Sequence, residues 1–183
     1  MNRFQMGSKL GEGQFGVVFA AIRTQTRKEV AIKIFKEAVD SWEEMMSLRE
    51  IMCVTHIPPH PNIVSVPEVH LNKVFPTLVM ERCDGSLLDL MDEYKTSNKR
   101  IEEPLIRSML REILMGIRHC HESNVVHRDV KPENILFRRE GSEPMVCKLG
   151  DFGLARRLPR GSLNYCPGMQ QSPPMTSYIS TRW

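Results

Sequence analysis

Four polar side chains lie close enough in the sequence to carry out one reaction together. Asp129, Lys131 and Asn134 belong to a short segment that begins at His127, and Asp151 follows after a gap of hairpin size as the first residue of Asp-Phe-Gly. The Asp129 carboxylate can accept a hydroxyl proton, while Lys131 can neutralise charge on a transferring phosphoryl group. Asn134 and Asp151 offer oxygen ligands of the kind that Mg²⁺ prefers. The pattern favours phosphoryl transfer to a hydroxyl over a solvated polar loop, with His127 packed and hydrogen-bonded rather than exchanging protons.

A charged side chain also stands in an apolar segment nearer the N-terminus. Lys33 ends the sequence Val-Ala-Ile-Lys in a run with strand character. A buried amine without an anionic partner costs several kcal/mol, so we expect a carboxylate beside it. Glu50, in the helical segment that follows, is the best candidate, and the pair would leave Lys33 able to contact nucleotide phosphates. The alternative is a lysine that reaches solvent from the edge of a strand.

A glycine-rich segment precedes both features. Residues 11–18, Gly-Glu-Gly-Gln-Phe-Gly-Val-Val, match the pattern GxGxxGxV. The pattern alone is weak, because an ordinary hairpin turn would also suit it. The glycines lie between two strand-like runs rather than between a strand and a helix, which disfavours a Rossmann dinucleotide turn. A strand-turn-strand loop of this kind suits a flap whose backbone amides close over phosphates.

Hydrophobic periodicity predicts the elements that must position these residues. Runs rich in β-branched or aromatic residues predict strands at residues 17–22, 30–35, 66–71 and 77–82. Residues 42–54 have a helical period, in which Met45, Met46 and Met52 suit core packing better than a ligand-binding stripe.

The rest of the chain is mainly helical. Apolar residues at every fourth position predict a helix from Pro104 to about Cys120, and they are Leu105, Met109, Ile113 and Ile117. Residues 135–137 and 145–149 predict a small hairpin. Residues 159–174 are rich in Pro, Gly, Ser and Gln and predict a loop.

Composition excludes several classes of protein. With 41% hydrophobic and 26% charged residues in 183, the chain is an ordinary globular sequence rather than a disordered or fibrous one. A net charge of +3 is too small and too scattered to favour nucleic acid. We expect a cytoplasmic or nuclear protein without a membrane partner, because no apolar run approaches membrane-spanning length and no signal peptide is evident. Five separated cysteines without a CxxC pair suit reduced thiols.

The whole chain resembles the eukaryotic protein kinases. It has their motifs in their order, which are the glycine loop, the strand lysine, the helix glutamate, the Asp129 segment and Asp-Phe-Gly. Residues 47–51, 60–64 and 176–183 resemble the CMGC kinases, and the Thr-x-Tyr pair before Thr-Arg-Trp is closest to the MAK-like and MAP kinase-like branch. The resemblance implies an α+β protein kinase fold. Residues 1–82 would form an N-lobe of antiparallel sheet with one helix, and residues 83–183 a partial, mainly helical C-lobe with the catalytic and activation loops.

The resemblance also implies roles in catalysis. Asp129 would be the catalytic base, while Asn134 and Asp151 would hold Mg²⁺. Lysine at position 131 and threonine at position 181 are the residue types found at these positions in serine/threonine kinases rather than in tyrosine kinases. The catalytic residues that it implies are Asp129, Lys131, Lys33, Glu50 and Thr181.

A nucleotide site is implied in the same way. Val18, Ala31 and Leu136 would sandwich the adenine, and the backbone of Glu81 and Cys83 would hydrogen-bond its edge. The implied ATP-binding residues are Leu10, Gly11, Glu12, Gly13, Gln14, Phe15, Gly16, Val17, Val18, Ala31, Lys33, Met80 as gatekeeper, Glu81, Cys83 and Leu136.

Three arginines match the positions that converge on a phosphorylated activation-loop residue in this family. They are Arg49, Arg128 and Arg156, and the matching phosphorylated position is Thr176. A phosphate of nearly two negative charges would satisfy such a cluster and help to order the loop. We therefore expect an upstream kinase to activate the protein by phosphorylating Thr176 and Tyr178.

Two hypotheses follow. The first is a monomeric CMGC serine/threonine protein kinase that uses ATP and Mg²⁺ and acts on a protein substrate. The second is a truncated, noncatalytic ATP-binding or interaction module, because in this family an Ala-Pro-Glu segment and further C-lobe helices would follow Trp183. The presence of every catalytic side chain argues against a degenerate kinase. Residues 161–170 resemble an insertion. Cyclin dependence stays open, although residues 47–51 lack the full cyclin-binding signature, which argues against it without excluding it.

Overall fold

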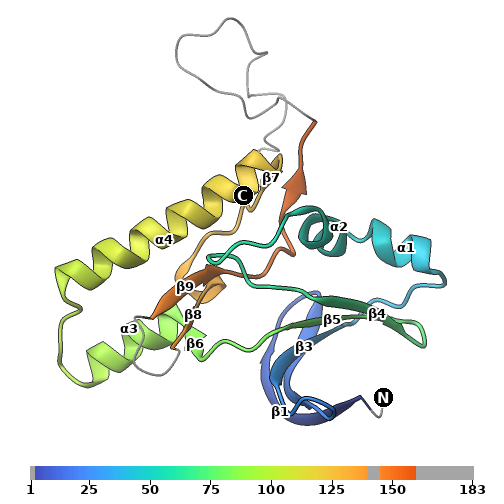
Figure 1. The fold of residues 1–183 in the computed structure, drawn as a ribbon, viewed down its shortest axis with the longest axis horizontal. Helices are drawn as coiled ribbons and strands as arrows, with labels where there is room; N and C mark the ends of the chain where they lie inside the picture. The colour runs from blue at the N-terminus through green and yellow to red at the C-terminus, as the bar shows by residue number, and fades with distance from the viewer. Residues whose placement is uncertain (1–2, 140–144, 160–183) are drawn as a thin grey trace, which may run out of the picture.

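The computed structural model describes residues 3–139 and 145–159. A five-stranded antiparallel sheet lies at one end of the molecule, and the helices α3 (Leu87–Thr96) and α4 (Glu103–Glu122) lie at the other (Figure 1). The predicted α+β architecture, an antiparallel sheet followed by a mainly helical part, is confirmed. The boundary predicted between residues 82 and 83 falls after the last strand of the sheet and stays a prediction, and Thr176, Tyr178 and Thr181 lie outside the described residues.

The large sheet follows the predicted strand pattern. Its strands lie in the order β1-β2-β3-β5-β4, and they are β1 (Phe4–Glu12), β2 (Gly16–Arg23), β3 (Glu29–Phe35), β4 (Glu68–Asn72) and β5 (Phe75–Glu81). Because side chains alternate along a strand, Ala31 and Lys33 point to one face and Ile32 to the other. On that other face Ile32 packs with Ala21 and Val79. The register thus reserves one face of the sheet for the residues predicted to bind nucleotide.

The helix predicted over residues 42–54 is broken, and this part of the prediction is wrong. The chain forms α1 (Trp42–Ser47) and α2 (Arg49–His56), separated by Leu48, whose ψ angle of 129° is not helical. The Ser47 hydroxyl donates to the carbonyl oxygen of Glu44 at 2.6 Å, which competes with the helical backbone pattern. The Leu48 side chain packs into the core beside buried Met45 and Ile51. The break places Arg49 and Glu50 in the first turn of α2.

The helical part matches the prediction closely. Leu105, Met109, Ile113 and Ile117 of α4 pack on the main core, whereas Ile106, Leu110 and Leu114 form a second, exposed stripe on the same helix. Small strands complete this part, and they are β6 (Gly85–Ser86), β7 (Val125–Val126), β8 (Ile135–Arg138), β9 (Val146–Leu149) and β10 (Arg156–Arg157), with the 3-10 turn η1 (Pro132–Asn134) before β8. Among the described helices, none has both the length and the apolar character needed to cross a bilayer.

A close backbone contact fixes α4 against the segment between α2 and β4. A Cβ atom built on Gly116 would lie 2.6 Å from the carbonyl oxygen of Asn62, so no larger residue fits there. That oxygen accepts the Leu149 N–H at 2.8 Å, and the Asn62 amide donates to the Cys147 carbonyl oxygen at 3.0 Å. Asn62 therefore joins α4 to β9, the strand that leads to Asp151.

His127 anchors the loop that carries Asp129. Its buried ring lies edge-on to Phe152, with centroids 4.8 Å apart. Nε2 is 2.7 Å from the Gly150 carbonyl oxygen, and Nδ1 accepts the Asp129 N–H at 3.3 Å. A carbonyl can only accept, so these partners require neutral imidazole with the proton on Nε2. His127 is packed and hydrogen-bonded, as expected from the sequence.

Gly116→Ala should lower the thermal unfolding midpoint. Alanine favours a helix interior over glycine by about 1 kcal/mol, but its methyl group would collide with the Asn62 carbonyl and force α4 away, at a cost of about 1–3 kcal/mol. Calorimetry or circular dichroism can measure the midpoint. Arg111→Ala, at an exposed position of α4, is the control and should change it little; a stabilised Gly116→Ala variant would contradict the contact.

The free energy of unfolding should fall as pH falls below about 6.5, in part through His127. Burial lowers the pKa of His127, against the opposing effect of the Gly150 carbonyl. The unfolded chain therefore binds a proton at His127 more readily than the folded chain does. The stability that neutral His127 contributes is complete above the pKa of the unfolded state and is lost as pH falls through the pKa of the folded state. Unfolding midpoints at pH 7.5 and 5.5 should differ less in His127→Gln than in the wild type. Equal pH dependence in both proteins would count against this role.

Candidate active site

A cleft of about 590 Å³ separates the five-stranded sheet from the β6-β8-β9 sheet. All of the residues predicted to bind ATP line it except Val17, whose side chain alternates to the other face of β2 between Gly16 and Val18. Glu50, Asn134 and Asp151 line it as well. Sequence reasoning missed other lining residues, which include Val64, Asp84, Ser86, Asp89, Glu133 and Gly150.

Lys33, Glu50 and Asp151 meet inside this cleft. The Lys33 ammonium lies 2.7 Å from both carboxylate oxygens of Glu50 and 3.2 Å from Asp151 Oδ1. Lys33 is 8% exposed and β3 is a central strand, so the alternative of a lysine reaching solvent from a strand edge is excluded. Burial raises the pKa of Glu50, and the charge of Lys33 only partly offsets that effect. The predicted pairing is therefore present.

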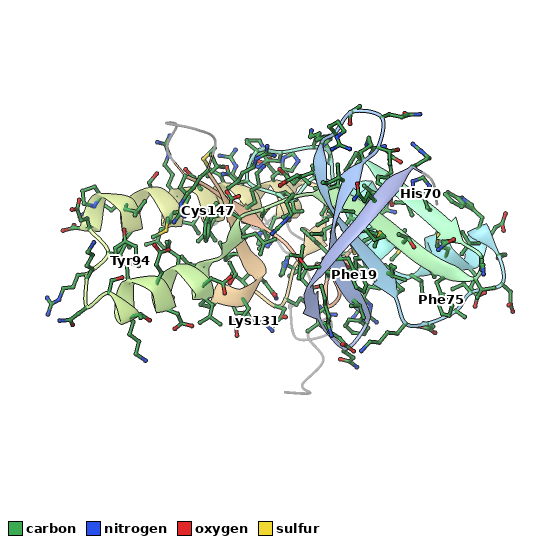
Figure 2. The ribbon with its side chains drawn as sticks, turned by 90° about the horizontal axis from the view of Figure 1, so that it is seen from below. Phe19, His70, Phe75, Tyr94, Lys131 and Cys147 are labelled. Carbon is green, nitrogen blue, oxygen red and sulfur yellow. The ribbon has the colours of Figure 1, made fainter. Side chains whose placement is uncertain are left out.

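Asp129, Lys131 and Asn134 form a second cluster. Asp129 Oδ2 lies 2.9 Å from the Lys131 ammonium and accepts the Asn134 side-chain N–H at 2.8 Å. Partial burial opposes ionisation of Asp129, but these two partners outweigh it and hold its pKa below the usual value. Asp129 is consequently an ionised carboxylate in a fixed orientation at neutral pH. Lys131 is labelled in Figure 2, where the two halves of the molecule meet.

The donor atoms near Asn134 and Asp151 fit a magnesium ion. The Asn134 amide nitrogen makes the bonds to Asp129, so its oxygen is the atom left to coordinate a metal. Asp151 is half exposed and adds an anionic oxygen close by, because the N–H of its neighbour Gly150 donates to the Asn134 carbonyl oxygen at 2.8 Å. Neutral and anionic oxygens are the ligands that Mg²⁺ prefers. No group of three or more His, Cys, Asp or Glu residues in residues 3–139 and 145–159 could hold a metal ion, so a site here would depend on the Asn134 amide oxygen as well as on carboxylates.

Backbone conformation is unusual where the functional residues lie. Arg128 and Asp151 have φ angles of 67° and 50°, in the left-handed region that non-glycine residues rarely adopt. The Arg128 side chain donates to the Leu154 carbonyl oxygen at 2.8 Å, which ties this loop to the segment after Asp151. A Cβ atom on Gly153 would lie 2.8 Å from the Phe15 ring, so the tip of the glycine loop rests on the same segment.

The three predicted regulatory arginines lie near one another. Burial lowers the pKa of Arg128, and the positive charges of Arg49 and Arg156 lower it further. The cluster brings together the first turn of α2, the Asp129 loop and β10. Its net positive charge is the feature that an anionic group would neutralise.

A sequence model of the protein kinase domain matches residues 4–183. Over 183 residues the chain is 35% identical to Cyclin-dependent kinase F-3 of Oryza sativa subsp. japonica and 35% identical to Serine/threonine-protein kinase MAK of Mus musculus. It is 36% identical over 184 residues to Cyclin-dependent kinase-like 4 of Mus musculus.

All three matches cover 100% of this chain, which spans 38%, 26% and 48% of those relatives in the same order. The matched domain extends over nearly the whole chain, and its glycine loop, ion pair and Asp-Phe-Gly segment surround one cleft. The chain therefore belongs to the protein kinase domain family, and its relatives are CMGC-group serine/threonine kinases.

Proposed function

We propose that the chain provides the catalytic cleft of a serine/threonine protein kinase that transfers the γ-phosphate of ATP to a protein hydroxyl. The observation that supports this best is the convergence of two clusters on one cleft. Lys33, paired with Glu50, offers a cationic group on one side, and Asp151 reaches it from the other side at 3.2 Å. Asp129 and Asn134 offer a carboxylate and an amide oxygen on the other.

The residues divide the work by their chemistry. Lys33 binds phosphate oxygens, and Asn134 with Asp151 would hold Mg²⁺, which neutralises phosphate charge when bound. Asp129 orients the substrate hydroxyl and takes its proton as the hydroxyl oxygen bonds to the γ-phosphorus and the bond to ADP breaks. Lys131, hydrogen-bonded to Asp129, stabilises the charge that develops on the transferring group.

Activation by phosphorylation is part of the proposal. Arg49, Arg128 and Arg156 repel one another, and a phosphate on Thr176 would turn that repulsion into charge-assisted hydrogen bonds. An upstream kinase that phosphorylates Thr176 and Tyr178 would supply that phosphate.

The noncatalytic alternative has one observation in its favour. The stripe of Ile106, Leu110 and Leu114 on α4 is exposed, and a contiguous apolar stripe suits contact with another polypeptide segment. An interaction module that binds ATP without transferring phosphate would use the same cleft. Turnover distinguishes the two functions, because nucleotide binding is common to both.

Asp129→Asn should reduce phosphate transfer about 10²- to 10⁴-fold, because the general base is lost, while Mg²⁺-ATP binding is retained. Transfer from radiolabelled ATP to a basic protein and binding by calorimetry can be measured on the same samples. Asp92→Asn, which removes an exposed carboxylate on α3, is the matched control. A wild-type chain that binds Mg²⁺-ATP without transferring phosphate would support the noncatalytic alternative.

Thr176→Ala should abolish the rise in activity that follows treatment with an activating kinase, because the arginine cluster then lacks its anionic partner. Mass spectrometry before and after treatment identifies the modified residue, and the rate of substrate phosphorylation gives the effect. Ser172→Ala, four residues earlier in the same segment, should activate normally. Equal activation of the wild type and Thr176→Ala would refute this part of the proposal.

A further inference from the structure

An ion network at the end of β5 takes no part in the chemistry described above. The carboxylate of Glu81 lies 3.1 Å from Lys148 Nζ and 3.5 Å from Arg138 Nη1. Its Oε1 also accepts the backbone N–H of Ser65 at 2.7 Å. The side chains of Lys148 and Glu81 are 12% and 11% exposed, so water screens this pair much less than a surface pair.

Lys148 joins three segments at this point. It lies on β9 opposite Leu136 of β8, and its ammonium also donates to the Pro61 carbonyl oxygen at 2.8 Å. The segment that contains Pro61 runs beside β9, where Ile63 forms a parallel bridge to Leu149 (Figure 1). Lys148 therefore connects the end of β5, the β8–β9 hairpin and the segment between α2 and β4.

These segments carry the part of the cleft that a nucleotide base would contact. Glu81 and Leu136 both line the cleft, and Asp151 follows Lys148 by three residues along the chain. The Glu81 N–H donates to the Ser65 carbonyl oxygen at 3.0 Å, so backbone and carboxylate are held by the same neighbour. A change at the carboxylate is consequently transmitted to the backbone at the end of β5.

We propose that Lys148 is a positioning residue for recognition of the adenine base. Its ammonium holds the Glu81 carboxylate, which fixes the end of β5 relative to Leu136; the inference rests on the proposed ATP-binding function. Lys148 does not line the cleft, so it acts through Glu81 rather than by touching the nucleotide. Without the ammonium, a largely buried carboxylate would lose its nearer cation and turn toward Arg138 or water.

The test separates base recognition from phosphate recognition. Calorimetry on the 183-residue chain would measure binding of Mg²⁺-ATP, adenosine and Mg²⁺-tripolyphosphate. In Lys148→Met, affinity for ATP and adenosine should fall about five- to twentyfold, while affinity for tripolyphosphate is unchanged. Lys148→Arg keeps the charge and should restore both. Lys33→Met should show the opposite pattern, with weaker binding of ATP and tripolyphosphate and unchanged binding of adenosine.

Arg118→Met is the matched control, because it removes a cation from an exposed ion pair with Glu122 on α4 and should change none of the affinities. If circular dichroism shows that Lys148→Met is unfolded, Glu81→Gln replaces it. That variant keeps the side-chain shape and an acceptor for the Ser65 N–H, and it should show the same selective loss.

Two results would overturn the inference. The first is that a folded Lys148→Met or Glu81→Gln variant binds ATP as tightly as the wild type does. The second is that such a variant loses adenosine and tripolyphosphate binding equally, which would indicate that Lys148 supports the whole cleft rather than base recognition. If the wild-type chain binds none of the three ligands, the proposed nucleotide binding itself fails and the inference falls with it. The wild-type measurement thus distinguishes failure of the function from failure of the positioning role.

Discussion

The position of Lys33 on a central strand imposes the constraint on which the active-site arrangement depends. Strands β2 and β5 flank β3, so the ammonium cannot reach bulk water and needs a partner inside the cleft. Glu50 supplies two oxygens at 2.7 Å, and because burial raises the pKa of Glu50, its charge depends in turn on Lys33. This mutual dependence holds α2 at one distance from the sheet. Asp151 approaches the same ammonium, so the segment proposed to bind the metal is oriented from the same point.

Because the helix is broken at Leu48, α2 contributes residues both to the Lys33–Glu50 pair and to the arginine cluster. Glu50 enters the cleft while its neighbour Arg49 interacts with Arg128, since successive side chains on a helix point about 100° apart. The interruption at Leu48 makes α2 a separate element whose orientation need not follow α1. Any rotation of α2 would alter both the Lys33–Glu50 pair and the arginine cluster. The proposed nucleotide binding and the proposed neutralisation of the arginines would therefore favour one orientation of α2 through different contacts.

Local sequence patterns predicted most of the helices and strands. The elements that they did not predict depend on contacts between residues far apart in the sequence. Alternating or helical periodicity predicted β2 to β5, α4 and the β8–β9 hairpin, and the chemistry of a buried amine predicted the partner of Lys33. Strand β1 was predicted only as a strand-like run without bounds before the glycines, because nearly all of its side chains are exposed. The two-residue strands β6, β7 and β10 exist only through pairing with distant segments. The break at Leu48 was missed because apolar spacing continues through it, whereas its causes are a side-chain hydroxyl and tertiary packing.

Strained backbone at the two functional loops is sustained by contacts between them. Arg128 precedes the proposed base and Asp151 is the proposed metal ligand, and both have positive φ angles that are costly without surrounding support. The support is reciprocal: His127 bonds to the Gly150 carbonyl, and Arg128 bonds to the Leu154 carbonyl. Each loop thus holds the other in a conformation that neither would keep alone. Because Arg128 also belongs to the arginine cluster, an anion bound there would act on the backbone that orients Asp129. The proposed regulation would thus reach the proposed catalytic base through direct backbone contacts.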